Sequence, residues 1–329
     1  MYDIISFGSA TLDVFMQSHK LQVLESDKFA TKKGICVPLG SKLHIKEVGF
    51  FMGGCGTNSA VTFGRQGLKT AYFGAIGKDV GGEQVKKVLS KNKVSLELLS
   101  ETNKHPTAFS VILSVPDVGR SILEKYGACH QLTEKDIPFD KLNANWFYIS
   151  SLSYKSHSIF VPLMKFAKEK GIKISSNPAG SIKTPEHIEI LKSVLDKIDI
   201  LILNKEECAK LTGENFEDEE KIFTKLDKWV KGIAVMTKGP DGVVVSDNKN
   251  IYRAGIPKSD LVDRTGAGDA FGSGFVAGFI EKQGDIAQAI QLGTANATSV
   301  LQELGAAKGL LKKGEWGPWE KVEVKIEKI

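Results

Sequence analysis

The chain has 329 residues, of which 42% are hydrophobic and 25% are charged, an ordinary balance for a globular enzyme. Its net charge is +5, but lysines and acidic residues are interspersed, so nucleic-acid binding is not predicted. No stretch approaches the ~20 apolar residues of a membrane span, and the start lacks the pattern of a signal peptide. The four cysteines form no CxxC pair. These features predict a cytoplasmic enzyme without a membrane or nucleic-acid partner.

Short apolar runs alternate with amphipathic stretches over most of the chain. This alternation predicts a mostly parallel sheet with helices on both faces, an α/β fold. The runs expected to be buried strands are Ile4–Phe7, Thr70–Ala75, Trp146–Ile149, Ile172–Ser175, Ile200–Leu203 and Ile233–Thr237. The expected helices between them are Asn58–Gln66, Ser158–Lys170, Pro185–Asp196 and Glu217–Lys231.

The last third of the chain begins with a predicted β-hairpin, formed by Val243–Ser246 and Ile251–Ala254. An antiparallel hairpin fits the edge of the sheet. Two helices are expected after it, at Ala267–Lys282 and Ile286–Leu304. The charged tail from Glu315 is expected to add one more strand.

Two regions break the alternation of strands and helices. Phe15–Val48 is polar and β-rich without a helical period, and Thr107–Lys125 consists of two alternating runs joined by a turn at Pro116–Gly119. By themselves these patterns favour surface loops and a hairpin.

The segment Asp263–Gly274, which reads DRTGAGDAFGSG, places a nearly bare backbone directly before a helix. The first amides of a helix point outward without partners, and the helix dipole adds positive potential, so this segment favours binding of an anion. Asp269 lies beside it and is a candidate to accept a proton from a hydroxyl. The alternative is a helix start capped by an acidic residue.

A second glycine-rich segment, Gly53–Gly82, precedes it by about 200 residues, and together the two resemble the signatures of the ribokinase-like (PfkB) carbohydrate kinase family. The resemblance covers roughly residues 3–307. Further matches occur in the family's order: Asp13, Asn177-Pro178, Asn204 with Glu207, Thr237 with Gly239, and Asn296.

The resemblance implies a ribokinase-like three-layer α/β/α core with a mostly parallel sheet, plus a small β-sheet lid. The core would comprise residues 1–14, 49–106 and 126–329. The lid would comprise residues 15–48 and 107–125, a discontinuous domain that often forms the contact of a homodimer in this family.

The resemblance also assigns catalytic and substrate-binding roles. Asp269 would be the general base, and the backbone of Gly266, Ala267 and Gly268 would hold the transferring phosphate. The residues expected to bind the substrate hydroxyls are Asp13, Gly54 and Asn58.

ATP and Mg²⁺ are the implied cofactors. Asn204 and Glu207 follow a strand at the edge where α/β sheets place ligands, and they suit Mg²⁺ bound through water. A helix cap with a first-turn acid explains the same pair, and Glu206 competes for the role. Asp263, with the backbone near Thr265 and Gly305, resembles the K⁺ site of some members. The residues expected near the nucleotide are Asn204, Thr237, Gly239, Gly242 and Asn296.

The predicted function is therefore an ATP-dependent kinase of a hydroxyl on a small sugar. The sequence departs from ribokinase, which has Lys where Cys55 stands and a pocket Glu near Ser150–Ser151 that is absent here. A nucleoside kinase of the same fold is the main alternative, because Phe15, Phe51 and Phe109 are candidates to stack on a base. A catalytically inactive sugar-binding regulator is a further alternative, which the intact Asp269 disfavours.

Overall fold

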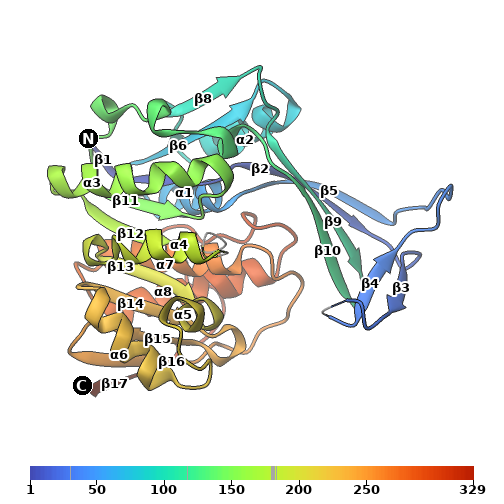
Figure 1. Ribbon diagram of the computed structural model, residues 1–329. Coiled ribbons are helices and arrows are strands. Elements are labelled where there is room, and N and C mark those ends of the chain that lie inside the picture. The colour runs from blue at the N-terminus through green and yellow to red at the C-terminus, as the bar shows by residue number, and fades with distance from the viewer. Residues whose placement is uncertain (30, 117, 179–181, 183) are drawn as a thin grey trace.

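The computed structural model describes residues 1–29, 31–116, 118–178, 182 and 184–329. In this part of the chain the central sheet has eleven strands in the order β17-β16-β15-β14-β13-β12-β11-β1-β6-β7, with β8 paired to β6 (Figure 1). All pairings from β14 through β1 to β7 and β8 are parallel, and β14 to β17 are antiparallel. The strands are β1 (Tyr2–Phe7), β6 (Thr70–Gly77), β7 (Val94–Ser95), β8 (Leu99–Thr102), β11 (Ala144–Ser150), β12 (Lys173–Asn177), β13 (Ile200–Asn204), β14 (Ile233–Thr237), β15 (Val243–Ser246), β16 (Asn250–Ala254) and β17 (Val324–Lys328).

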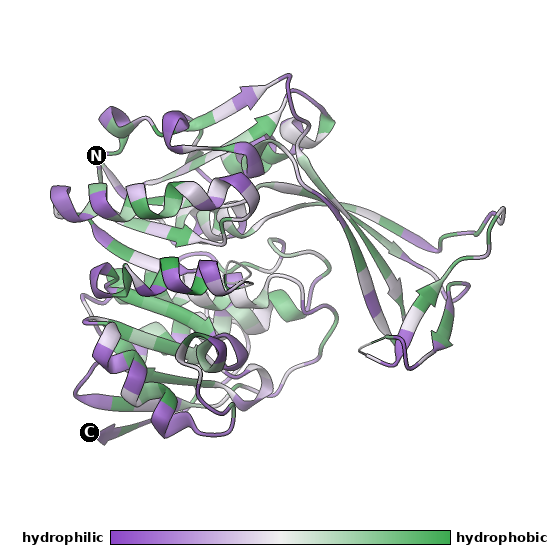
Figure 2. Cartoon of the chain, in the orientation of Figure 1, coloured by the Kyte–Doolittle hydropathy of each residue, from purple (hydrophilic) through white to green (hydrophobic). Residues whose placement is uncertain are grey.

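Helices cover both faces of this sheet, as the alternating pattern predicts (Figure 1). The face with α3, α4, α5 and α6 encloses one apolar cluster, and the face with α1, α7 and α8 encloses another. Strands β13 and β14 are apolar over four of their five residues because both of their faces are buried (Figure 2). The helices are α1 (Cys55–Arg65), α2 (Val80–Lys91), α3 (Phe160–Lys170), α4 (Pro185–Lys192), α5 (Lys205–Thr212), α6 (Glu219–Trp229), α7 (Ala267–Glu281) and α8 (Ile286–Leu301).

A separate four-stranded sheet projects from the core and is called the projecting sheet below (Figure 1). Its order is β10-β9-β2-β5, with strands β2 (Thr11–Gln17), β5 (Glu47–Gly53), β9 (Ala108–Val115) and β10 (Gly119–Lys125). A small hairpin of β3 (Gln22–Glu25) and β4 (Lys33–Cys36) lies between β2 and β5 in the chain. The predicted α/β fold with a small additional sheet is thus confirmed.

The observed elements differ from the expected ones at several ends. Helix α1 begins at Cys55, before the expected Asn58, and α8 ends at Leu301. Strands β2 and β5 run across the boundaries expected between the core and lid at residues 14 and 48. One residue of the expected turn at 116–119, residue 117, lies outside the described part of the chain.

Helix α2 was not predicted from the sequence, whereas strand β17 was. The sequence analysis did not predict α2, which opens with two glycines; it begins where the Asp79 carboxylate accepts a hydrogen bond from the Gly82 amide, 2.9 Å away. The expected extra strand in the tail is present as β17, paired with the edge strand β16. None of the described helices is long and apolar enough to cross a membrane.

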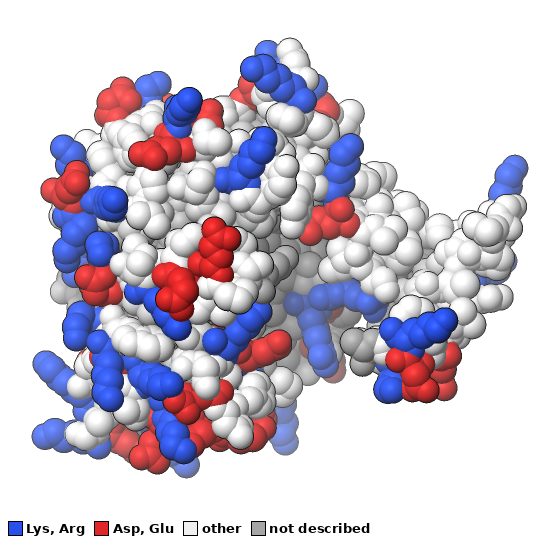
Figure 3. Space-filling model, viewed as in Figure 1, with Lys and Arg blue, Asp and Glu red and all other residues white. Residues whose placement is uncertain are grey.

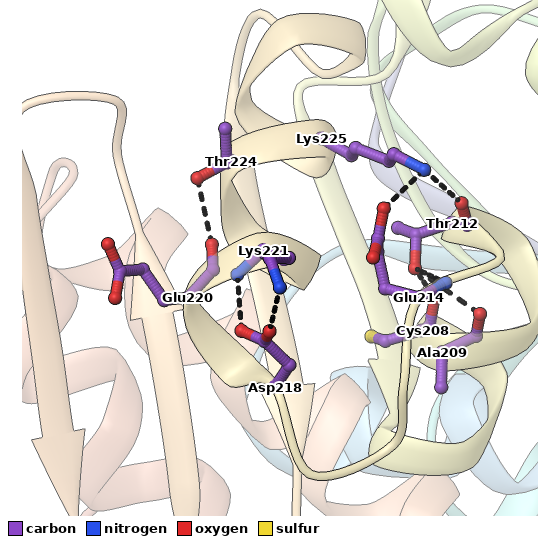
Figure 4. A network of polar contacts seen from close by, with 9 residues as sticks. All are labelled: Cys208, Ala209, Thr212, Glu214, Asp218, Glu220, Lys221, Thr224 and Lys225. Carbon is purple, nitrogen blue, oxygen red and sulfur yellow. Dashed lines mark hydrogen bonds and ion pairs between the residues drawn. The ribbon is translucent and has the colours of Figure 1, made fainter.

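A polar network fixes the segment between α5 and α6 (Figure 4). The Lys225 ammonium group donates to the carbonyl of Thr212, 2.9 Å away, and pairs with Glu214. Asp218 caps α6 by accepting from the amide of Lys221 at 3.1 Å. These contacts tie the end of α5 to α6.

Candidate active site

The proposed base, Asp269, lies in the first turn of α7 and contacts two residues of α1. The Asn58 side-chain amide donates to its carboxylate at 2.9 Å, and the Cys55 thiol is also a hydrogen-bond donor to it. Burial raises the pKa of the Asp269 carboxyl, and the hydrogen bonds from Asn58 and Cys55 partly oppose that shift. The sequence analysis did not assign Cys55, although it lies between two glycines of the early motif.

Asn58 has a second polar group that no residue satisfies. Its side chain is 3% exposed, and its carbonyl oxygen has no hydrogen-bond partner among the described residues. A buried acceptor without a partner is costly unless a ligand or water supplies a donor. The same side chain therefore donates to the proposed base through its nitrogen and offers its oxygen as an acceptor to a ligand.

The N-cap and first turn of α7, residues 266–269, are called the anion loop below. Gly266 caps the helix with φ 81°, a left-handed conformation that favours glycine. A Cβ added there would lie 2.4 Å from the Cβ of Ala306, so only glycine fits. The amides that follow, from Ala267 to Asp269, are the first of the helix and have no intrahelical acceptor. Their arrangement suits a phosphate group.

Asp13 lies on β2 of the projecting sheet, not at the end of a core strand. Its carboxylate accepts a hydrogen bond of 2.6 Å from the Ser110 hydroxyl on β9. Burial raises the pKa of Asp13, and the charges of Glu124, Asp263 and Asp269 add to the shift. A Cβ on Gly53 would lie 1.9 Å from the Asp13 carboxylate, and Gly54 has φ 100° with its backbone against Ser9. The glycine pair thus lets β5 and α1 approach these groups closely.

A pocket of about 330 Å³ lies beside the anion loop. Ala267 and Gly268 form part of its wall, and most of the remaining wall is apolar. Three residues of the predicted nucleotide region line it: Thr237, Gly239 and Gly242. Helix α8 contributes Thr294, Ala297, Thr298 and Leu301. A nucleotide has a flat base and an anionic phosphate chain. A mostly apolar pocket next to an anion-binding helix start suits these two parts.

Asn296, expected near the nucleotide, does not line this pocket. Its side chain is fully buried, its amide donates to the Ala270 carbonyl at 2.8 Å, and its carbonyl accepts from the Leu311 amide at 2.9 Å. The bond to Ala270 joins α8 to α7, and the bond from Leu311 joins α8 to the segment after it. The two helices pack closely because Gly274 and Gly293 have no side chains between them. The wall residues Thr294, Ala297 and Thr298 lie on the next face of the same helix.

Asn204 and Glu207 form a reciprocal capping box at the start of α5. The Asn204 side chain accepts from the Glu207 amide at 2.8 Å, and the Glu207 carboxylate accepts from the Asn204 amide at 2.9 Å. Asn204 pairs with Thr237 in the sheet, so this cap borders the pocket. The described residues contain no group of three or more acidic, His or Cys side chains placed to bind a metal.

Asp263, expected at a monovalent cation site, is paired with a protein cation. The Arg120 guanidinium, on β10 of the projecting sheet, donates to one of its carboxylate oxygens. The same oxygen accepts from the Thr265 amide at 3.0 Å and from the Thr265 hydroxyl at 2.8 Å.

The three aromatic residues that are candidates to stack on a base lie on two different faces of the projecting sheet. Asp13 pairs with Phe51 and with Ser110, so Phe15 and Phe51 lie on the same face of the projecting sheet as Asp13. Phe109 pairs with Leu12 and lies on the opposite face. Of the three candidates, Phe15 and Phe51 therefore share a face with Asp13, and Phe109 does not.

Comparison with known proteins decides the family. A model described as the pfkB family carbohydrate kinase matches residues 4–313. The chain belongs to the pfkB family of carbohydrate kinases. It is a phosphotransferase that acts on an alcohol group, as its named relatives in this family are.

Individual members of the family resemble most of the chain. A ribokinase from Lactococcus lactis is 29% identical over 266 residues, covering 80% of this chain and 83% of its own length. A nucleoside kinase from Methanothermobacter thermautotrophicus is 24% identical over 273 residues, covering 82% and 85%. The structure of the Arabidopsis thaliana ribokinase with ribose and ATP superposes with a TM-score of 0.78 at 24% identity, covering 95% of this chain and 96% of that one. That structural likeness shows the same fold.

Proposed function

We propose that this pfkB kinase transfers the γ-phosphate of ATP to a hydroxyl of a small, unphosphorylated sugar, with Asp269 as the general base. The observation that carries this proposal is the juxtaposition of Asn58 and Asp269 at the start of α7. It places a carboxylate of raised pKa and a buried, unpartnered amide oxygen beside the N–H groups of the anion loop.

In the proposed reaction the sugar hydroxyl gives its proton to Asp269 as its oxygen attacks the γ-phosphorus. The new P–O bond forms while the bond from that phosphorus to the oxygen of ADP breaks. A base of raised pKa accepts the proton more readily than an ordinary carboxylate. The amides of Ala267 and Gly268 stabilise the negative charge on the transferring phosphoryl oxygens.

Asp13 and Asn58 are the proposed ligands of the substrate hydroxyls. Asp13 is largely buried and has one donor, Ser110, within the described part of the chain, which leaves lone pairs for a ligand. The amide oxygen of Asn58 accepts a hydrogen bond from a hydroxyl next to the one that reacts. Sugars present such adjacent donors.

The nucleotide would occupy the pocket beside the anion loop, with its base against Ala297 and Leu301 of α8. Mg²⁺, when bound with ATP, neutralises the phosphate charge. Glu207, a carboxylate in the capping box beside Thr237, would hold this ion through water. We do not include K⁺, since Arg120 already neutralises the Asp263 carboxylate.

A nucleoside is the second candidate substrate. Phe15 and Phe51 lie on the Asp13 face of the projecting sheet, where an aromatic side chain suits a base, and one of the similar relatives is named a nucleoside kinase. Here Asp13 would bind the ribose part of the molecule.

The experiment that tests the function measures ADP formation and product mass with a panel of sugars, sugar phosphates and nucleosides. Phosphorylation of free sugars supports the first proposal, and phosphorylation of nucleosides alone supports the second. A preference for sugar phosphates contradicts the pocket assignment. Binding of sugars without any transfer would indicate the inactive regulator.

We also propose that the projecting sheet acts as a lid over the substrate and as a contact with a second copy of the chain. Its face opposite Asp13 exposes Val48, Phe50 and Leu123, at 52%, 63% and 60%. In Figure 3 the visible surface of this sheet carries few charged side chains between the core and its tip, whereas both signs are mixed over the core. The parent should be a dimer in solution, and Phe50→Glu should reduce its mass to that of a monomer. A monomeric parent, or a variant that stays dimeric, would show that the proposed contact with a second copy is wrong.

A further inference from the structure

Arg120 joins two parts of the molecule that are 143 residues apart in sequence. It lies near the outer end of the projecting sheet, and its guanidinium donates to Asp263, just before the anion loop. The Asp263 side chain is 5% exposed and that of Arg120 is 31% exposed. Among the described residues, Arg120 provides the one cation within 4 Å of this carboxylate. A buried carboxylate is destabilising without such a partner.

The contact continues from Asp263 into the anion loop. The oxygen that accepts from Arg120 also accepts from the amide and hydroxyl of Thr265, the residue directly before Gly266. The conformation of the turn into Gly266 therefore depends on where this carboxylate is held, and Arg120 holds it.

A second contact reaches the same loop from the same face of the sheet. The Phe51 ring lies so close to Gly305 that a Cβ there would be 2.7 Å from it, and the next residue, Ala306, packs against Gly266. Strand register places Asp13, Phe51 and Arg120 on one face of the projecting sheet. Figure 1 shows the orange segment after β16 extending toward β10.

We propose that Arg120 is a positioning residue that holds the anion loop in register with the substrate-binding face of the projecting sheet, acting through Asp263 and Thr265. This inference rests on the proposed function and goes beyond it, because it gives Arg120 a role through Asp263 and not through contact with substrate or phosphate. With the ion pair intact, the distance between the anion loop and the Asp13 face of the projecting sheet is fixed. Without it, the sheet separates from the loop, water enters and phosphate is transferred to water more often.

The kinetic test compares Arg120→Ala and Arg120→Lys with Lys125→Ala, a control that removes a cation from the same strand on the opposite face. Arg120→Ala should lower kcat about 10- to 100-fold, the range for misplaced groups, with the KM for ATP nearly unchanged. The fraction of ATP hydrolysed without phosphorylated product should rise. Arg120→Lys should restore part of the loss, and Lys125→Ala should resemble the parent.

A double-mutant cycle identifies the route through Asp263. Arg120→Ala should have little further effect in an Asp263→Asn background, because the partner charge is already gone. Independent, multiplying effects of the two substitutions would overturn the proposal. So would an Arg120→Ala enzyme that changes only the KM of the sugar, since that indicates direct substrate binding.

Hydrogen exchange of the unliganded protein separates this inference from the proposed function, because it needs no activity. Arg120→Ala should speed exchange in residues 263–268, and Lys125→Ala should not. Unchanged exchange there with Arg120→Ala overturns the positioning role. Faster exchange in a protein that phosphorylates nothing in the panel would refute the proposed function and leave the coupling of sheet and loop in place.

Discussion

The Asn58 side-chain nitrogen lies 2.9 Å from a carboxylate oxygen of Asp269, and this hydrogen bond joins α1 to α7 across 211 residues of sequence. It links the two glycine-rich segments of the chain. Asn58 donates to the proposed base, and its own oxygen has no partner among the described residues. One side chain is thus placed both to orient the base and to accept from the hydroxyl next to the reacting one, as proposed above.

Asp269→Asn should retain the fold and ATP binding but lower kcat by at least ~10²-fold, because the amide cannot accept the hydroxyl proton. Steady-state kinetics together with a nucleotide-binding titration measure the two effects. Near-normal turnover in a folded variant would exclude Asp269 as the base.

Asn58→Ala should shift the acidic limb of the kcat profile to higher pH. The base must be ionised, so activity falls as pH drops through its pKa, and the Asn58 hydrogen bond lowers that pKa. Removing the bond raises the pKa, and activity is then lost at a higher pH than in the parent. Ser59→Ala is the control, because its hydroxyl bonds to the Cys55 carbonyl instead. A limb that stays in place or moves to lower pH contradicts the role given to Asn58.

Glu207→Gln should raise the Mg²⁺ concentration needed for half-maximal activity while leaving thermal stability nearly unchanged. Glutamine can still accept from the Asn204 amide in the capping box, so the substitution removes the charge and keeps the cap. Activity is titrated with Mg²⁺, and Glu206→Gln is the matched control on an exposed neighbour. If only the Glu206 variant shifts the titration, the wrong acid has been assigned.

Asp13→Ala should reduce kcat/KM for the sugar by about 10- to 150-fold, the effect of losing a hydrogen bond to a charged acceptor worth roughly 1.5–3 kcal/mol. The KM for ATP should change little, because Asp13 lies on the projecting sheet and not in the nucleotide pocket. An enzyme impaired only toward ATP would refute this assignment.

Gly242→Ala should raise the KM for ATP and lower the melting temperature more than Gly239→Ala does. Both glycines line the pocket and both have positive φ, a backbone conformation that strains an alanine. A Cβ at Gly242 would also lie 2.0 Å from the Ala254 carbonyl, whereas nothing lies within 4 Å of one at Gly239. Equal effects of the two substitutions would contradict the role of this close approach in shaping the pocket.

The sequence by itself determined the elements whose cause is local. Strand β14 begins and ends where its apolar run does, because a strand buried on both faces must be apolar throughout. The bare backbone before Asp269 predicted a helix start that suits an anion, since the amides of a first turn need no distant residue to be exposed. Ordered motifs along nearly the whole chain predicted the family.

Only the tertiary structure decided which side chains meet. Asn296 was expected at the nucleotide, but the rotation of α8 against α7 turns it into the helix interface and presents Ala297 instead. The pairing of Asp13 with Ser110, and the position of Phe109 on the opposite face, depend on the register of β2 with β9. A shift of one residue would pair Asp13 with a neighbour of Ser110 and move the β9 side chains to the other face. Cys55 reaches Asp269, and Arg120 reaches Asp263, only because long-range packing brings together segments that no local pattern connects.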